Sequence, residues 1–331
     1  MKVPKVSVII PVYKAEKYIE QCVRSLFEQS LDEIEFIFID DCGGDDSINI
    51  ITRILEKYPT RQSQVKIIHH DINLGVGQSR QDGIDVATGE FIIHCDADDW
   101  VDHRMYQKLY QAAKDHNADI VACGYTEVFL TKEINHSEFV PKTKYDRVKA
   151  IIDGKLHGSL WNKLVRKKLY TTAAIKFEPD ICFWEDLGAA IRFFYIAVNV
   201  ININECLYYY RRNDESATAS LNEAKVYSMI AVAKDSINFL KGTDDKINFT
   251  PIIQQLAFNS KKNLLITGNG CYNPKKWRET FPEYNRYVFK IRATPLVRLF
   301  YILAICHIDF ISRIYVSRPP FLLKIKHFLL R

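Results

Sequence analysis

Four short apolar runs alternate with amphipathic segments over the first hundred residues. The runs cover residues 5–12, 34–39, 65–69 and 91–93. Continuous β-branched runs of this kind are typical of parallel strands that are covered on both faces. Helices are expected between them, at 15–29, at 48–58 and in the segment that ends near residue 87. This alternation predicts an α/β fold with a mostly parallel central sheet and right-handed crossovers.

The pattern changes in the second hundred residues. We expect a strand at 119–128 on the antiparallel edge of the sheet, a polar loop at 131–143 and a helix at 159–168. A further helix is expected from Glu185 to about residue 197, because acidic residues at a helix start complement the helix dipole. A strand at 200–203 follows it.

The last third of the chain reads as helical. Helices are expected at 223–241 and 251–266, followed by an interrupted apolar segment at 296–311 and a basic helix at 321–331. Basic helices with large apolar faces bind anionic membrane surfaces, so this region is a candidate for peripheral membrane contact. A helical cover packed on the catalytic domain, or a dimer contact, is the alternative. Because no run of about 20 uncharged apolar residues occurs, we predict no membrane-spanning helix.

Composition narrows the class of protein. The 331 residues are 47% hydrophobic and 26% charged, which fits a soluble protein with a sizeable core. A net charge of +5 is mild for this length, so no nucleic-acid partner is expected. The eight cysteines are scattered without a C-x-x-C pair, which argues against a zinc site or a disulfide framework. These features, with no signal peptide before the first strand, predict a cytoplasmic protein.

Acidic residues gather where the predicted strands end. Asp96, Asp98 and Asp99 directly follow the fourth run, and Asp40 and Asp41 follow the second. Crowded carboxylates repel one another unless a cation lies between them. In parallel α/β sheets, ligands bind beyond the carboxyl ends of the strands. An isolated acidic turn would be a surface feature, but several strand ends that meet at one edge indicate a site.

Two familiar phosphate-binding loops are excluded. The segment Gly75-x-Gly77, with the next glycine at Gly83, has neither the spacing nor the position of a dinucleotide-binding loop. The sequence G-x-x-x-x-G-K-[ST] is also absent. A nucleotide diphosphate would therefore need a metal ion and an arginine, for which Asp96, Asp98 and Arg80 are candidates.

Several motifs in order resemble glycosyltransferase family 2 with the GT-A fold, of the bacterial surface-polysaccharide type. They are V-S-V-I-I-P-V-Y (6–13), D-D-C-G-G-D-D-S (40–47), N-L-G-x-G-x-S-R (73–80), D-A-D-D-W (96–100), W-N-K-L (161–164) and E-D (185–186). The resemblance covers roughly residues 5–215. This chain departs from the family pattern at Lys14, where asparagine is usual, and at Cys42 and Gly43, where glycine and serine are usual.

The resemblance implies roles for the residues at the strand ends. A carboxylate of Asp40 or Asp41 would accept a hydrogen bond from the nucleobase, for which uracil is expected. Arg80 would bind the diphosphate or a base edge. The nucleotide-sugar site would comprise Pro11, Tyr13, Glu16, Asp40, Asp41, Asn73, Arg80 and Asp96. A Mg²⁺ or Mn²⁺ ion would be held by Asp96, Asp98 and Asp99.

The resemblance also implies a catalytic base. Inverting transfer needs a base that takes the proton of the acceptor hydroxyl. Asp186 is the candidate, with Glu185 as its neighbour or the alternative. Arg211 and Arg212 are expected to be a solvated pair; the alternative is that one of them reaches the diphosphate when a loop closes.

These implications combine into one functional hypothesis. The GT-A domain would occupy residues 1–220, with a donor half at 1–100 and an acceptor half at 101–220, and residues 221–331 would form a helical appendage. The enzyme would transfer a sugar from a UDP-sugar to a glycan or lipid-linked acceptor, at the inner face of the cell membrane. The alternatives are a sugar-phosphate nucleotidyltransferase and a degenerate sugar-nucleotide-binding subunit. The former should have a glycine-rich basic loop after the first strand, which residues 11–16 do not provide.

Overall fold

The apolar runs of the first hundred residues form parallel strands in the computed structural model, which describes residues 3–212, 221–243, 247–266, 271–291, 293 and 295–308. The strands pair in the order β3-β2-β1-β4, which confirms the parallel sheet expected for the first hundred residues. Their bounds are Val6–Val12 (β1), Ile34–Asp40 (β2), Val65–His69 (β3) and Phe91–His94 (β4). The helices between and after them are α1 (Ile19–Phe27), α2 (Ser47–Leu55), α3 (Gly75–Val86) and α4 (Met105–Asp115), with a 3-10 turn, η1 (Pro59–Gln64).

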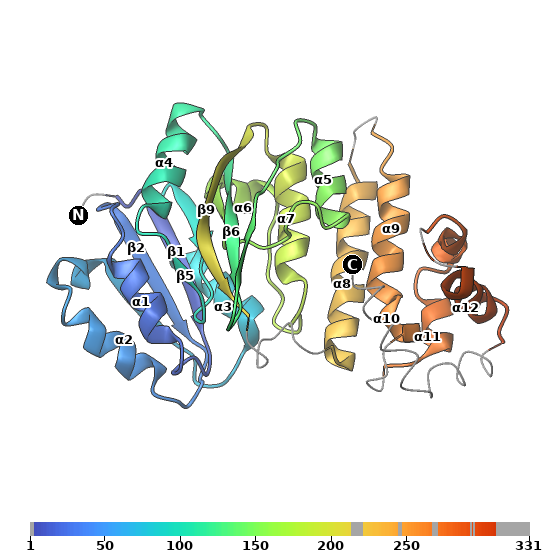
Figure 1. Ribbon diagram of the computed structural model, residues 1–331, viewed down its shortest axis with the longest axis horizontal. Coiled ribbons are helices and arrows are strands. Elements are labelled where there is room, and N and C mark those ends of the chain that lie inside the picture. Colours follow the sequence, from blue (N-terminus) through green and yellow to red (C-terminus); the bar gives the residue numbers. More distant parts are fainter. Residues whose placement is uncertain are drawn as a thin grey trace. The chain divides into compact units, whose positions relative to one another are not determined.

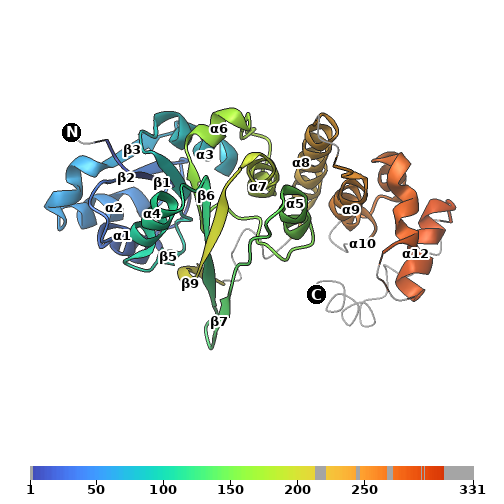
Figure 2. The same ribbon diagram turned by 90° about the horizontal axis from the view of Figure 1, so that it is seen from above.

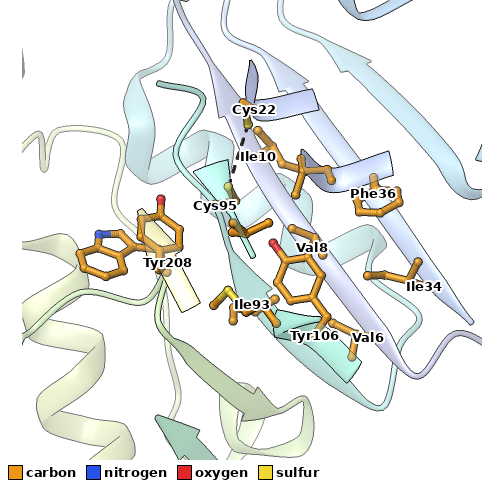
Figure 3. Packing of buried hydrophobic residues seen from close by; sticks show 14 of the residues in the cluster. Val6, Val8, Ile10, Cys22, Ile34, Phe36, Ile93, Cys95, Tyr106 and Tyr208 are labelled. Atoms are coloured by element: carbon orange, nitrogen blue, oxygen red, sulfur yellow. Dashed lines mark hydrogen bonds between the residues drawn. The ribbon is translucent and has the colours of Figure 1, made fainter. Parts of the chain in front are cut away.

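Helices cover both faces of this sheet, which is why its strands are apolar on both sides (Figure 2). On one face, α3 lies so close that a Cβ atom at Gly83 would come within 2.5 Å of Ile9 Cγ2. On the other face, the Cys22 thiol of α1 lies 4.0 Å from the Cys95 thiol within the apolar core (Figure 3). Because Cys95 directly precedes the acidic turn, this core anchors the carboxyl end of β4.

The next hundred residues extend the same sheet with strands of mixed direction (Figure 1). The order continues β4-β8-β6-β9-β5, and β7 pairs with β6. The strands are β5 (Trp100–Val101), β6 (Ile120–Val128), β7 (Glu133–His136), β8 (Lys163–Arg166) and β9 (Val200–Arg211). β6 is antiparallel to β8, which is antiparallel to β4, and β9 is parallel to β6. The carboxyl ends of β6 and β9 therefore lie at the same edge as the acidic turn.

Three expectations for this half are wrong. The strand at 119–128 is interior, because β6 has β8 and β7 on one side and β9 on the other. The polar segment 131–143 contains β7, whose side chains alternate between exposed and half-buried. The helix expected at 159–168 is absent: the chain turns at 161–162 and enters β8. The spacing of apolar residues in this segment suggested a helix, but residues 163–166 form a strand because they pair with β4 and β6.

Helices complete the two compact units into which the chain divides, Met1–Ala219 and Ser220–Arg331. The first unit also contains α5 (Lys144–Ile152), α6 (Lys168–Thr172) and α7 (Glu185–Ile196). The second contains α8 (Glu223–Lys241), α9 (Thr250–Lys261), α10 (Asn263–Ile266), α11 (Pro274–Glu279), the 3-10 helix η2 (Pro282–Phe289) and α12 (Pro295–Ile305). α7 begins at Glu185 as expected.

A separate apolar core holds the second unit together. Trp277, Tyr301 and Phe258 are buried within it. The Lys261 ammonium is buried beside them and donates to the backbone oxygen of Trp277, at 3.2 Å. The basic helix expected at 321–331 lies outside the described residues. In the part of the chain that the structure describes, no helix has the length and apolarity needed to cross a membrane.

Candidate active site

The acidic turn after β4 is held in place from behind by β9. Asp99 is buried, and its carboxylate accepts hydrogen bonds of 2.7 Å from the Tyr208 hydroxyl and from the backbone N–H of Arg211. The Arg211 side chain donates through Nε to the backbone oxygen of Asp98, at 2.8 Å. Burial, with the nearby charges of Asp98 and Asp96, raises the pKa of Asp99 well above its ordinary value. Asp99 therefore supports the turn, while Asp96 and Asp98 remain partly exposed.

A buried arginine joins two motifs that lie about a hundred residues apart. Arg80, in α3, has its Nη2 atom 3.2 Å from Asp96 Oδ1 and its Nε atom 3.5 Å from Glu185 Oε1. Burial would lower the pKa of Arg80, but the carboxylates of Asp96, Glu185 and Asp186 outweigh it and raise that pKa. The Nη1 atom is buried without a hydrogen-bond partner among the described residues. One guanidinium thus connects the acidic turn to the start of α7. Its Nη1 group is left to donate a hydrogen bond to a ligand.

The start of α7 carries two adjacent carboxyl groups with different surroundings. The preceding residue, Trp184, takes the left-handed conformation (φ 70°), which turns the chain sharply into the helix. Glu185 faces Arg80, and burial raises its pKa against the effect of that arginine. Burial and the charge of Glu185 raise the pKa of Asp186 to about 7. A carboxyl group with this pKa can take up a proton near neutral pH.

The two acidic residues after β2 make different contacts. Asp41 is buried and accepts the backbone N–H groups of Leu74 and Gly75, at 2.8 and 2.9 Å. Its carboxylate therefore fixes the N-terminus of α3, which carries Arg80. Asp40 is partly exposed, and its Oδ2 atom lies 2.9 Å from Nδ1 of His69. Of the two acids, only Asp40 has its carboxylate at the surface of the sheet edge.

The departures from the family pattern meet in space. Lys14 and Cys42 both take the left-handed conformation, with φ of 50° and 56°. Gly43 lies against Lys14 so closely that a Cβ atom there would be 2.8 Å from the Lys14 backbone nitrogen. Glycine is thus required at position 43 because two backbone segments touch, and it cannot be exchanged for serine without movement.

The remaining expected donor residues surround this contact. Glu16 Oε2 accepts the backbone N–H of Asp46 at 3.2 Å, which joins the loop after β1 to the loop after β2. Tyr13 and Asn73 are exposed, and Pro11 is half-buried at the end of β1. All of these positions lie at or after the carboxyl ends of β1, β2 and β3.

Sequence reasoning missed Tyr208 and expected a different role for Arg211. The Tyr208 hydroxyl also accepts the backbone N–H of Asp96, at 3.1 Å. Arg211 lies between the rings of Tyr18 and Trp100, 5.1 and 4.7 Å from their centroids. The alternation of side chains along β9 could have pointed to Tyr208, because it places residue 208 on the opposite face of the sheet from residues 207 and 209. Arg212 is exposed and forms a salt bridge with Glu127.

A preformed metal site is not seen. Among the described residues, no three His, Cys, Asp or Glu side chains are arranged to hold a metal ion. Asp96 and Asp98 are nevertheless partly exposed carboxylates on one turn. Mg²⁺ is commonly bound by one or two carboxylates together with substrate phosphates and water, so these two residues fit an ion that arrives with a diphosphate.

Comparison with known proteins gives the family. The model described as Glycosyl transferase family 2 matches residues 7–173, about half of the chain. The chain belongs to this family. A relative, the uncharacterized glycosyltransferase EpsJ of Bacillus subtilis, is 32% identical over 223 residues, covering 65% of this chain and 63% of EpsJ. The glycosyltransferase EpsH of the same organism is 30% identical over 248 residues, covering 73% of this chain and 70% of EpsH.

Solved structures identify the fold. The TarS 1–349 structure from Staphylococcus aureus, in complex with UDP-GlcNAc, superposes with a TM-score of 0.70. It is 21% identical and covers 91% of this glycosyltransferase and 87% of TarS 1–349. The expected GT-A fold is therefore confirmed. A curated TarS is a poly(ribitol-phosphate) beta-N-acetylglucosaminyltransferase, 25% identical over 237 residues.

Proposed function

We propose that this glycosyltransferase moves a sugar, with inversion, from a UDP-sugar to a hydroxyl group of a glycan or lipid-linked acceptor. One observation carries the proposal: Arg80 lies within 3.2 Å of Asp96 and 3.5 Å of Glu185. It connects the turn suited to the donor diphosphate with the pair suited to proton transfer. A reaction centre between the two carboxylate groups would have the leaving group on one side and the acceptor on the other.

Asp186 is the base in this mechanism. It takes the proton from the acceptor hydroxyl as that oxygen attacks the anomeric carbon, while the bond to the diphosphate breaks. Glu185 is paired with Arg80, so its charge is compensated and it serves to hold that arginine and raise the pKa of Asp186. The adjacent acids therefore have separate roles.

Two groups would stabilise the departing diphosphate. The Nη1 donor of Arg80 is oriented in a buried environment, where a charge-assisted hydrogen bond is strong. Asp96 and Asp98 would hold Mg²⁺ or Mn²⁺, which would neutralise charge on the leaving diphosphate. Asp99 belongs to the supporting layer behind them, because its oxygens face Tyr208 and Arg211.

The donor base would lie at the ends of β1 and β2. The exposed ring of Tyr13 offers a stacking surface, and Asp40 offers an acceptor for an imide N–H. An imide is present in uracil but not in adenine or cytosine. The TarS complex with UDP-GlcNAc supports a uridine nucleotide for this fold.

The acceptor and the location are part of the proposal and are supported by what is known of one relative. The curated TarS is named as a glycosyltransferase that acts on a polymer, poly(ribitol-phosphate), which supports a role of this chain in polysaccharide synthesis. We place this role at the cytoplasmic face of the membrane. Peripheral contact through the basic C-terminal segment is part of this proposal. A chain that ends at Pro319 should then bind anionic liposomes more weakly than the full chain. Equal binding of the two chains would leave the segment without a membrane role.

The alternatives make different predictions. A nucleotidyltransferase would release pyrophosphate from UTP and a sugar phosphate, whereas family membership places this chain among glycosyltransferases. A degenerate binding subunit would bind the donor without releasing UDP.

The deciding experiment is a thermal-shift screen of nucleotide sugars with Mn²⁺, followed by a UDP-release assay on the donor that stabilises the protein. We expect Asp186→Asn to lose UDP release while donor binding is kept. Asp180→Asn, an exposed acid in the preceding loop, is the matched control and should behave as wild type. Loss of donor binding together with turnover in Asp186→Asn would disprove its role as base.

A further inference from the structure

A histidine lies between two acidic residues beside the start of α3. His70 directly follows β3, and only 6% of its side chain is exposed. Its Nδ1 atom lies 2.8 Å from Asp41 Oδ1, and its Nε2 atom lies 2.8 Å from Asp82 Oδ2. Asp41 belongs to the loop after β2, and Asp82 belongs to α3. One imidazole ring therefore joins three segments of the chain, and we refer to these three residues as the His70 bridge.

The two contacts indicate the charge of the ring. An ionised carboxylate only accepts hydrogen bonds, so a ring that donates to two carboxylates carries a proton on each nitrogen. Burial would lower the pKa of His70, but the hydrogen bonds to Asp41 and Asp82 outweigh it and raise that pKa above its ordinary value of 6.5. Asp41 and Asp82 are the charged groups that face the ring. The geometry therefore favours an imidazolium at neutral pH.

The same bridge fixes the segment that leads to Arg80. Besides His70, the Asp41 carboxylate accepts the backbone N–H groups of Leu74 and Gly75, at 2.8 and 2.9 Å. Asp41 is buried, and a buried carboxylate is costly unless a cation compensates its charge. His70 is the cation beside it. Because α3 begins at Gly75, the protonated ring stabilises the arrangement from which this helix starts.

The start of α3 also contacts the loop before α7. A Cβ atom at Gly77 would come within 2.8 Å of the backbone oxygen of Glu178, so the two backbones touch. About one turn further along α3, Arg80 lies 3.2 Å from Asp96 and 3.5 Å from Glu185. A displacement of the start of α3 would therefore change the position of Arg80 relative to both carboxylates.

We propose that His70, as an imidazolium between Asp41 and Asp82, is a positioning residue for transfer, which holds α3 so that Arg80 can bind the donor diphosphate. The inference rests on the proposed function and deepens it. When His70 loses a proton, one ring nitrogen turns a lone pair toward a carboxylate, and the charge of Asp41 loses its compensation. Because the pKa of His70 is raised in the folded protein, the bridge is complete below pH 6.5 and is lost as the pH rises through that raised pKa. Donor affinity should decline with it.

Three variants separate the charge of the ring from its place in the fold. His70→Gln removes the cation. Asp82→Asn keeps an oxygen that can accept from Nε2 but removes one negative charge, so it should lower the pKa of His70. His103→Gln is the control, because His103 is an exposed histidine whose Nδ1 atom lies 3.7 Å from Asp102 Oδ1.

The measurement is the affinity for UDP with Mn²⁺, followed by titration calorimetry across neutral and alkaline pH. UDP binding involves no proton transfer to Asp186, so it isolates the effect of His70 from that of the base. The ionisations of UDP itself are common to all four proteins, so only differences between them are interpreted. NMR of the imidazole carbons gives the pKa of His70 directly, with His70→Gln identifying its resonance.

We expect wild type and His103→Gln to lose UDP affinity as the pH rises, with a midpoint at the pKa of His70 found by NMR. In Asp82→Asn, this midpoint should move to lower pH. In His70→Gln, affinity at neutral pH should be about tenfold weaker and this decline should be absent, because Arg80 is no longer held by a titrating group.

Three results would overturn the proposal. They are an alkaline decline that is the same in wild type and His70→Gln, a midpoint that rises in Asp82→Asn, and an NMR titration that shows His70 neutral at pH 6.5. If wild type binds no UDP at any pH, the uridine donor of the proposed function fails, and hydrogen exchange then decides on the bridge. The amides of residues 74–80 should exchange faster in His70→Gln than in His103→Gln, and equal exchange would disprove that His70 holds α3.

Discussion

The hydroxyl of Tyr208 donates a 2.7 Å hydrogen bond to the carboxylate of Asp99, although β9 and the acidic turn are separated by more than a hundred residues. The same hydroxyl accepts the backbone N–H of Asp96. One side chain therefore fixes both ends of the D-A-D-D turn. The conformation of the turn that carries Asp96 and Asp98 is thus set by β9, a strand from the second half of the sheet.

This relationship gives the first prediction. Tyr208→Phe removes both hydrogen bonds and leaves a buried carboxyl group with one partner fewer, which should cost about 1–3 kcal/mol of folding stability. The loosened turn should also raise the KM for the metal–donor complex more than it lowers kcat. Urea unfolding and steady-state UDP release would measure the two effects. Tyr209→Phe, on the other face of β9, is the control, and an unchanged KM in Tyr208→Phe would contradict the positioning role.

Arg80 is expected to be irreplaceable by lysine. A single ammonium cannot reach both Asp96 and Glu185 in the fork geometry of a guanidinium. We expect Arg80→Lys to fold but to lose transfer by at least tenfold, with weaker UDP binding. The measurement is kcat/KM for the donor, with the exposed Arg53→Lys as the control. Full activity of Arg80→Lys would show that charge alone is sufficient at this position.

The pH dependence of transfer follows from the raised pKa of Asp186. A base acts only when it is deprotonated, so activity should rise with pH and reach half its plateau near pH 7. The negative charge of Glu185 helps to raise that pKa. Glu185→Gln should therefore move the acidic limb to lower pH, whatever its effect on the plateau. A pH–rate profile of kcat/KM for both proteins tests this, and a shift in the opposite direction would remove Asp186 as the titrating base.

The contact between Gly43 and Lys14 predicts a stability effect near the nucleotide site. A Cβ atom at position 43 would approach the Lys14 backbone nitrogen to 2.8 Å, and backbone cannot move aside as a flexible side chain can. Gly43→Ala should lower the free energy of unfolding by about 1–3 kcal/mol, as overpacking does in well-packed regions. Gly242→Ala, where the nearest atom would be 3.4 Å away, is the control. Equal melting temperatures for the two variants would show that the loops adjust freely.

The sequence by itself determined the fold of the first hundred residues. The runs that became β1 to β4 are apolar on both faces, and such runs are stable only when helices cover both sides of a parallel sheet. Strand ends of a parallel sheet meet at one edge, so the acidic turn, Asp40 and Arg80 could be assigned to one site from their order in the chain. The start of α7 at Glu185 followed from local rules as well.

Only the tertiary structure decided which member of each acidic group is buried and hydrogen-bonded within the protein and which is partly exposed. Asp40 and Asp41 are adjacent residues of the same type, yet only the Asp41 carboxylate accepts hydrogen bonds from the backbone N–H groups at the start of α3. The Asp99 carboxylate likewise accepts hydrogen bonds from Tyr208 and Arg211. Both residues belong to β9, which lies beside the turn only in the folded sheet. The strand at Lys163–Arg166 was also decided by tertiary structure, because its conformation is set by hydrogen bonds to β4 and β6. Local patterns record which face of a segment is apolar, but not which distant groups will satisfy its polar atoms.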